Sequence, residues 1–201
     1  MTQKQYNEML PTLYTGCGVA CYSNDFLGKV EKIVEHSQLK RLGLPSNYPI
    51  PTHIRVIVVY DSPFVMKGKQ YPSGIYTYEQ LETGSTLKLF TDSTPATGNF
   101  RIIYPASPFD DEQKLAFKNE SEHLHLVSKS YGFEDFVLEP LNADLDIDYT
   151  KCMGANDQRI ICSARFSLAF NRAVIGAYQH PYCDTPLEIV ANRLVRLNPS
   201  V

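Results

Sequence analysis

The 201-residue sequence has no tryptophan, no excess of basic residues and no long uninterrupted apolar run. Its formal net charge of −3 leaves no surplus of cations to displace counterions from phosphates, so we do not expect nucleic-acid binding. The most apolar stretch, residues 160–178, contains Arg165 and Arg172 and is too short between these charges to cross a bilayer. We therefore expect neither a nucleic-acid partner nor a membrane.

Cysteine is also scarce. The five cysteines are an odd number in a long chain, which does not indicate the disulfide framework of a small secreted domain: Cys17, Cys21, Cys152, Cys162 and Cys183. Residues 1–15 carry charged and polar groups in place of the apolar segment of a secretion signal. Reduced thiols and a cytoplasmic protein are the resulting expectation.

What the sequence does contain is the composition of an ordinary globular domain. It is 43% hydrophobic and 20% charged, which argues against disordered and fibrous chains. A chain of this length buries roughly 70% of its unfolded surface and folds without disulfides or metals. No internal repeat or linker divides it, so we expect one domain over residues 1–201.

Apolar spacing and end signals predict three main helices and a weaker one before Pro11. The first begins at Asn24 or Asp25 and ends near Gly43. The second starts at Ser107-Pro108, continues into acidic residues and ends near Gly132. The third, over residues 185–198, opens on the capping box Thr185-Pro-Leu-Glu188.

Strands are predicted between these helices. The β-branched run 54–60 has apolar residues at both odd and even positions after its arginine. This pattern is typical of a central strand that is covered on both faces. Further strands are expected at 75–78, 86–91 and 99–104 as a meander, and at 133–138, 162–170 and 173–178. This order predicts an α+β fold: an antiparallel sheet of about five to six strands with helices on one face.

Residues 101–115 read Arg-Ile-Ile-Tyr-Pro-Ala-Ser-Pro-Phe-Asp-Asp-Glu-Gln-Lys-Leu, a strand running into an acidic helix start. This stretch, with the element order over 24–178, resembles the GAF and PAS group of sensory domains. The resemblance implies a sensor-like core over 24–178, a C-terminal helix over 185–198, and a non-catalytic ligand-binding role in a bacterial-type regulatory protein. It carries over no binding residue, because GAF domains share no universal ligand motif. The cysteine–histidine pair of bilin-binding members has no counterpart here.

Four tyrosines on or beside the predicted meander are candidates for a ligand-binding cleft: Tyr60, Tyr76, Tyr78 and Tyr104. A phenol offers a ligand both an apolar face and a hydroxyl. The alternative is that tyrosines simply suit half-exposed sheets.

Cys17 lies between two glycines in the string Thr15-Gly-Cys-Gly-Val-Ala-Cys-Tyr22. A glycine-flanked turn there, with His36 or one of the later histidines as the base, would make Cys17 the nucleophile of a cysteine-dependent hydrolase or transferase. The competing interpretation is that the glycines relieve backbone crowding while the following residues pack in the core.

Histidine and cysteine also supply candidate zinc ligands: His123, His125, His180 and Cys183. On a helix His123 and His125 point about 200° apart, so the sequence predicts no metal site. The alternating Asp144, Asp146 and Asp148 lack the glycine and distal glutamate of a calcium loop and indicate a solvated strand edge. No cofactor is identified.

Three classes of function stay open. The leading one is a sensory domain that binds a small molecule or a protein partner and pairs as a homodimer through its first and last helices. The second is the Cys17 enzyme, and the third is a structural or interaction protein without a pocket.

Overall fold

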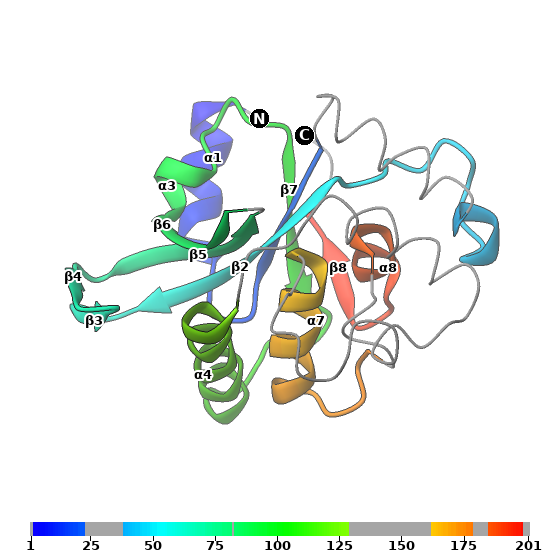
Figure 1. The fold of residues 1–201 in the computed structure, drawn as a ribbon. Helices are drawn as coiled ribbons and strands as arrows, with labels where there is room; N and C mark the ends of the chain where they lie inside the picture. Colours follow the sequence, from blue (N-terminus) through cyan, green and yellow to red (C-terminus); the bar gives the residue numbers. More distant parts are fainter. Residues whose placement is uncertain (1, 23–37, 82, 129–161, 179–184, 199–201) are drawn as a thin grey trace.

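The computed structural model describes residues 2–22, 38–81, 83–128, 162–178 and 185–198 (Figure 1). Six strands form one antiparallel sheet in the order β6–β5–β2–β1–β7–β8. A separate two-stranded hairpin, β3 (Phe64–Met66) and β4 (Lys69–Tyr71), projects beyond it. Helices pack against this sheet. The predicted α+β architecture with an antiparallel sheet is therefore confirmed.

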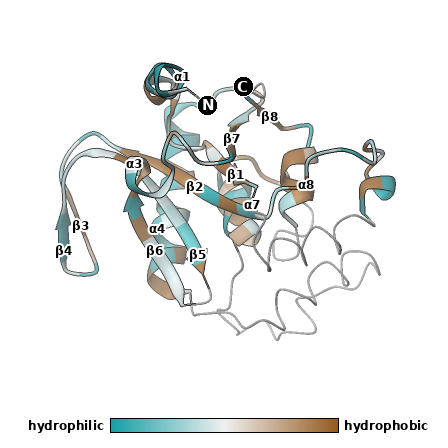
Figure 2. Ribbon diagram, turned by 90° about the horizontal axis from the view of Figure 1, so that it is seen from above, coloured by the Kyte–Doolittle hydropathy of each residue, from teal (hydrophilic) through white to brown (hydrophobic). Residues whose placement is uncertain are grey.

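Strand β2 (His53–Tyr60) lies inside the sheet, between β1 (Gly18–Cys21) and β5 (Gly74–Leu81). Its residues Ile54, Val56 and Val58 belong to one core cluster, whereas Ile57 belongs to a second. Because successive side chains of a strand point to opposite faces, β2 is covered on both sides, as its sequence predicts. The hydropathy colouring of Figure 2 shows the apolar run along this strand.

The predicted meander is correct for its first part only. Strands β5 and β6 (Gly84–Leu89) pair as neighbours, but β7 (Phe100–Pro105) pairs with β1 and not with β6. The helical turn α3 (Phe90–Ser93) interrupts the chain after β6. Phe90 is buried against Tyr6 and Phe100, and this anchor directs the chain across the sheet to β1. The strand expected to reach residue 91 therefore ends at Leu89.

Helices cover the two faces unequally. The longest, α4 (Asp111–Val127), lies beside α7 (Cys162–Ala173) on one side of the sheet, and α8 (Pro186–Ala191) continues this layer (Figure 1). The opposite face is covered by α1 (Gln3–Met9) and the short 3₁₀ helix η1 (Leu10–Thr12). The weaker N-terminal prediction is thus confirmed, and helices occupy both faces.

The start of α4 is held by a capping box. The side chain of Asp110 accepts from the Gln113 N–H at 2.8 Å, and Gln113 accepts from the Asp110 N–H at 3.1 Å. These bonds satisfy two donors that a helix start leaves open. The helix begins three residues after the predicted start at Pro108 and ends at Val127, before Gly132.

Residues 162–173 form helix α7, so the strand predicted for 162–170 is wrong. Phe166, Phe170 and Ala173 recur at helical spacing, whereas the apolar residues at 162, 164, 166, 168 and 170 recur at every second position, so both periods fit this sequence. α7 is enclosed by α4, β2 and β5 and is buried on nearly all sides, including Ser163 and Ser167. Ser163, Ser167 and Asn171 do recur at helical spacing, but the alternation over residues 162–170 is equally regular, so the pattern alone does not decide between helix and strand.

The partner strand predicted for 173–178 is also wrong. Residues 174–178 form a turn closed by Asn171, whose side chain donates to the Tyr178 carbonyl at 2.8 Å and accepts from the Tyr178 N–H at 2.7 Å. One side chain here replaces the ladder of hydrogen bonds that a strand would need.

The last predicted helix is shorter than expected. Its capping box is present, since Thr185 accepts from the Glu188 N–H at 3.3 Å and Glu188 accepts from the Thr185 N–H at 2.9 Å. The helix ends at Ala191, and residues Val195–Leu197 form strand β8 at the sheet edge beside β7. Val195 is therefore buried through strand pairing and not through a helix face.

Other predicted elements lie mainly outside the described residues. Of the helix expected from Asn24, residues 38–41 are described and are helical, and Gly43 follows with φ +67°. The strand at 133–138 and the acidic segment 142–148 are not described.

Arg165 is the largest fully buried side chain. Five oxygen atoms lie within hydrogen-bond distance of its two terminal nitrogens. Four are around Nη2 and one is beside Nη1: Gln80 Oε1 (2.9 Å), Ser85 Oγ (2.8 Å), Ser128 Oγ (2.8 Å) and the Leu124 carbonyl (3.2 Å), and the Ser121 carbonyl (3.3 Å). The two carbonyls belong to the last turns of α4, the negative end of that helix. Among the described residues no carboxylate forms an ion pair with Arg165. This side chain thus joins α7 to α4, β5 and β6.

We predict that Arg165→Met lowers the free energy of unfolding by about 3 kcal/mol, because it leaves several buried oxygen atoms without a donor. Urea denaturation at neutral pH measures this loss. The control is Arg172→Met on the same helix, where an exposed ion pair with Glu120 at 3.0 Å is lost and a change below about 0.5 kcal/mol is expected. Equal losses in the two variants would show that the buried hydrogen bonds contribute nothing.

Candidate functional site

Three of the four candidate tyrosines come together. Tyr60, at the end of β2, and Tyr76 and Tyr78 of β5 belong to the same core cluster on the α4 side of the sheet. Tyr104 does not join them, since it lies in β7 next to Tyr14 and hydrogen-bonds to Thr12 at 2.8 Å. A cleft lined by all four tyrosines is therefore not present in this arrangement.

The hydroxyls of the three clustered tyrosines are satisfied by protein atoms. Tyr60 donates to Glu122 Oε1 at 2.8 Å and lies 2.5 Å from the Tyr78 hydroxyl, so Tyr78 is the donor of that second bond. Tyr76 donates to the Pro72 carbonyl at 3.0 Å. Burial raises the pKa values of Tyr60 and Tyr78 above the ordinary value of a phenol. All three remain protonated at neutral pH.

The aromatic rings of this cluster also contact neighbouring side chains closely. Phe64 of β3 stacks on Tyr60 with ring centroids 3.6 Å apart, and the Lys118 ammonium lies 4.4 Å from the Tyr60 ring. Tyr71 of β4 stacks on Phe64 in turn. The cluster anchors the base of the β3–β4 hairpin, and its tyrosines belong to the core.

Cys17 is fully buried among the core residues beneath α1. Burial raises the pKa of its thiol to about 12, although the nearby backbone and Arg196 act in the opposite direction. The thiol is therefore protonated at neutral pH. His36, its proposed base, lies outside the described residues.

Packing accounts for the two glycines beside Cys17. Gly16 has φ +117°, a conformation that side chains disfavour, and a Cβ there would lie 2.5 Å from the Phe109 ring. A Cβ on Gly18 would lie 2.6 Å from the Phe166 ring of α7. The glycines on either side of Cys17 are therefore explained by packing, because each lets an aromatic ring lie against the backbone.

The two described zinc candidates lie apart, as their helical spacing predicts. His125 is buried, with Nδ1 2.6 Å from Ser85 Oγ, whereas His123 is exposed. Burial, with the charges of Lys67 and Arg165, lowers the pKa of His125 to about 4. His180 and Cys183 are not described. Within the described ranges no three His, Cys, Asp or Glu side chains are grouped to hold a metal ion.

A buried ion cluster on the α1 side of the sheet was not foreseen. Glu79 of β5 accepts from Arg55 Nε at 2.9 Å and lies 3.0 Å from His53 Nε2. Burial by itself raises the pKa of the Glu79 carboxyl, but His53 and Arg55 more than offset this and lower it to about 2. Arg55 also donates to Thr94 Oγ1 at 3.3 Å, so the cluster fixes the end of α3 against the sheet.

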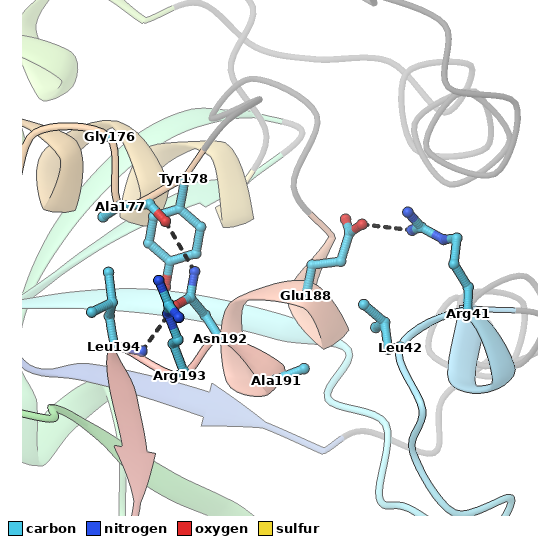
Figure 3. Close-up of a pocket in the computed structure, with 10 residues that line it drawn as sticks. All are labelled: Arg41, Leu42, Gly176, Ala177, Tyr178, Glu188, Ala191, Asn192, Arg193 and Leu194. Atoms are coloured by element: carbon cyan, nitrogen blue, oxygen red, sulfur yellow. Dashed lines mark hydrogen bonds and ion pairs between the residues drawn. The ribbon is translucent and has the colours of Figure 1, made fainter.

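A pocket of about 580 Å³ lies beside α8 (Figure 3). Three segments line it, the 41–42 stretch, the 176–178 turn and the α8–β8 connection: Arg41, Leu42, Gly176, Ala177, Tyr178, Glu188, Ala191, Asn192, Arg193 and Leu194. Its volume lies within the range of small-molecule sites. None of the described residues that were predicted as sites lines it.

Asn192 holds two walls of this pocket together. Its side-chain amide donates to the Ala177 carbonyl at 3.1 Å, and its side-chain oxygen accepts from the Leu194 N–H at 2.9 Å. Both bonds are drawn in Figure 3. The turn after α7 is thereby fixed to the end of α8, and this part of the wall is formed without a ligand.

The pocket lining combines apolar and charged groups. Leu42, Leu194 and Tyr178 supply apolar surface, while Arg41 Nη2 lies 2.6 Å from Glu188 Oε1 across the rim. Such a mixture provides burial for a ligand body together with polar groups that fix its orientation. This combination of apolar and charged side chains is suited to binding a small molecule.

Sequence reasoning missed this pocket because its lining comes from segments more than 130 residues apart in the chain, Arg41 and Gly176 for example. The capping box at Thr185 was the one local signal near it. Comparison with protein-family models and with curated proteins gives no match to this chain. In the described part of the chain no helix is long and apolar enough to cross a membrane.

Glu79→Gln tests the ion cluster. Because the folded pKa is lowered from 4.5 to about 2, the ionised carboxylate stabilises the fold above pH 4.5, and this contribution is lost as the pH falls toward 2. We expect the variant to be less stable at neutral pH, on the order of 3 kcal/mol, with the gap narrowing through that window. Urea denaturation across the pH range measures it. Glu8→Gln, at an exposed position of α1, should show a small gap throughout.

Iodoacetamide labelling tests Cys17. We expect Cys17 to stay unmodified in the native protein at neutral pH, because its thiol is buried and protonated, and to react once guanidinium chloride unfolds the chain. Peptide mass spectrometry reads the labelled positions. Fast modification of native Cys17 would contradict this and favour the enzyme.

Proposed function

We propose that this chain is a non-catalytic sensory domain that binds a small molecule in the pocket bounded by residues 41–42, the 176–178 turn and the α8–β8 connection. One observation carries the proposal: the pocket holds about 580 Å³ and has apolar surface beside charged and amide groups. Sites of this size and lining are typical of small-molecule binding.

The position of the pocket favours a regulatory role. Its walls meet at α8, and α8 leads within a few residues into β8, which pairs with β7 at the sheet edge. A ligand that contacts both the Arg41 segment and α8 binds best to one placement of α8 against the sheet. Binding would therefore shift the protein toward that placement, which is how a ligand changes a two-state equilibrium.

The alternatives have less support. A cysteine enzyme needs a thiolate with access to substrate, and the Cys17 thiol is buried and protonated. For a structural or interaction protein no observation speaks as directly as the pocket does for ligand binding. The GAF/PAS-like character, the cytoplasmic location and a homodimer remain part of the same sensory proposal.

Native mass spectrometry of protein purified from its host tests the proposal, since it reports a retained ligand directly. We expect a bound small molecule in the wild-type protein and its loss in Ala191→Trp, where the indole fills the pocket from α8. The control is Ile175→Trp in the adjacent turn, because Ile175 is 96% exposed and does not line the pocket. This variant should retain the ligand.

Two results would overturn the proposal. One is a ligand retained equally by Ala191→Trp with its fold intact, which places the ligand elsewhere. The other is no retained ligand and no thermal stabilisation of the wild-type protein by any member of a metabolite panel.

A further inference from the structure

The described part of the pocket lining carries more positive than negative charge. It includes two arginines, Arg41 and Arg193, and one carboxylate, Glu188. Both arginine side chains are exposed to solvent and border the pocket, where they can meet the polar end of a ligand. Among the described lining residues there is thus one more cation than anion.

Glu188 is already engaged on both oxygens. Oε1 lies 2.6 Å from Arg41 Nη2, and Oε2 accepts from the Thr185 N–H at 2.9 Å as part of the capping box. Its negative charge is directed to Arg41 and to the start of α8 and is not available to Arg193.

Arg193 has no hydrogen-bond or ion-pair partner among the described residues. It is nevertheless well placed, since the neighbouring Asn192 side chain bonds to Ala177 on one side and to Leu194 on the other. Figure 3 shows Arg193 beside Asn192 and Tyr178. A guanidinium presents a planar set of N–H donors that matches the oxygen atoms of a carboxylate or phosphate.

Resting on the proposed function, we infer that the ligand is a small organic anion whose carboxylate or phosphate group binds Arg193 and whose apolar body lies against Leu42, Tyr178 and Leu194. The apolar lining provides burial and the guanidinium provides orientation. Cationic ligands are disfavoured at this site, because the Arg193 guanidinium repels them.

A set of probes with one shared body tests the charge. The probes are 4-phenylbutyrate, 4-phenylbutanol and 4-phenylbutylamine, which are an anion, a neutral molecule and a cation, together with the phosphate monoester of 4-phenylbutanol. Calorimetry or ligand-observed NMR gives their affinities. We expect at least one of the two anions to bind about tenfold more tightly than the alcohol, and the amine to bind least. The comparison of the two anions distinguishes a carboxylate site from a phosphate site.

Arg193→Gln assigns the effect to this side chain. It should weaken the preferred anion about tenfold and leave the affinity for the alcohol unchanged. The matched control is Arg196→Gln, which removes the same charge from β8 at a side chain that lies over the Tyr104 ring and outside the pocket lining. This control should leave all the affinities unchanged.

The outcomes separate the two proposals. If the alcohol binds as tightly as both anions and Ala191→Trp removes the binding, the proposal of a small-molecule pocket is supported and the inference of an anionic ligand is overturned. If Arg193→Gln weakens all the probes equally, its role is structural and the inference again fails. If none of the probes binds and no retained ligand depends on Ala191, the proposed function itself is overturned.

Discussion

The arrangement of α4, α7 and one edge of the sheet depends on a single buried cation, Arg165. A guanidinium removed from water has to be met by oxygen atoms, and here five of them come from three elements. Burial lowers the pKa of this group to about 10, which leaves it charged at neutral pH. Its donors lie in one plane, so the positions of Gln80, Ser85 and the end of α4 are fixed relative to α7.

A short series of hydrogen bonds connects helix α7 to one wall of the pocket. Asn171, near the end of α7, closes the turn at Tyr178, and Asn192 then ties Ala177 to the start of β8. Two asparagine side chains thus connect the core helix to the wall that holds Arg193. The opposite wall, at Arg41, is joined to α8 by the ion pair with Glu188 and by a buried hydrogen bond that Thr185 Oγ1 donates to Gln38 Oε1 at 3.0 Å. Both walls of the pocket are therefore tied to α8 or to the core by side-chain contacts.

Local signals in the sequence predicted local structure well. The β-branched run of β2 and the capping box at Thr185 each determine a backbone conformation within a few residues, and both were read correctly. The prediction for α7 failed because apolar residues fall at every second position over residues 162–170 as well as at helical spacing, so the pattern fits a strand and a helix equally. The pairing of β7 with β1 depends on Phe90 packing against Tyr6, a contact between distant residues. The pocket was missed for the same reason, since no spacing within one segment indicates that Arg41 and Arg193 lie around one space.

The pairing of β1 with β7 also sets the order in which this chain can fold. Cys21 lies opposite Phe100, about 80 residues later, whereas β2, β5 and β6 are close in sequence and pair as hairpins. During synthesis strands β2, β5 and β6 can pair before β7, the second neighbour of β1, has been made. Until β7 emerges, one edge of β1 exposes unpaired backbone groups beside apolar residues, which is the kind of surface that other chains can add to.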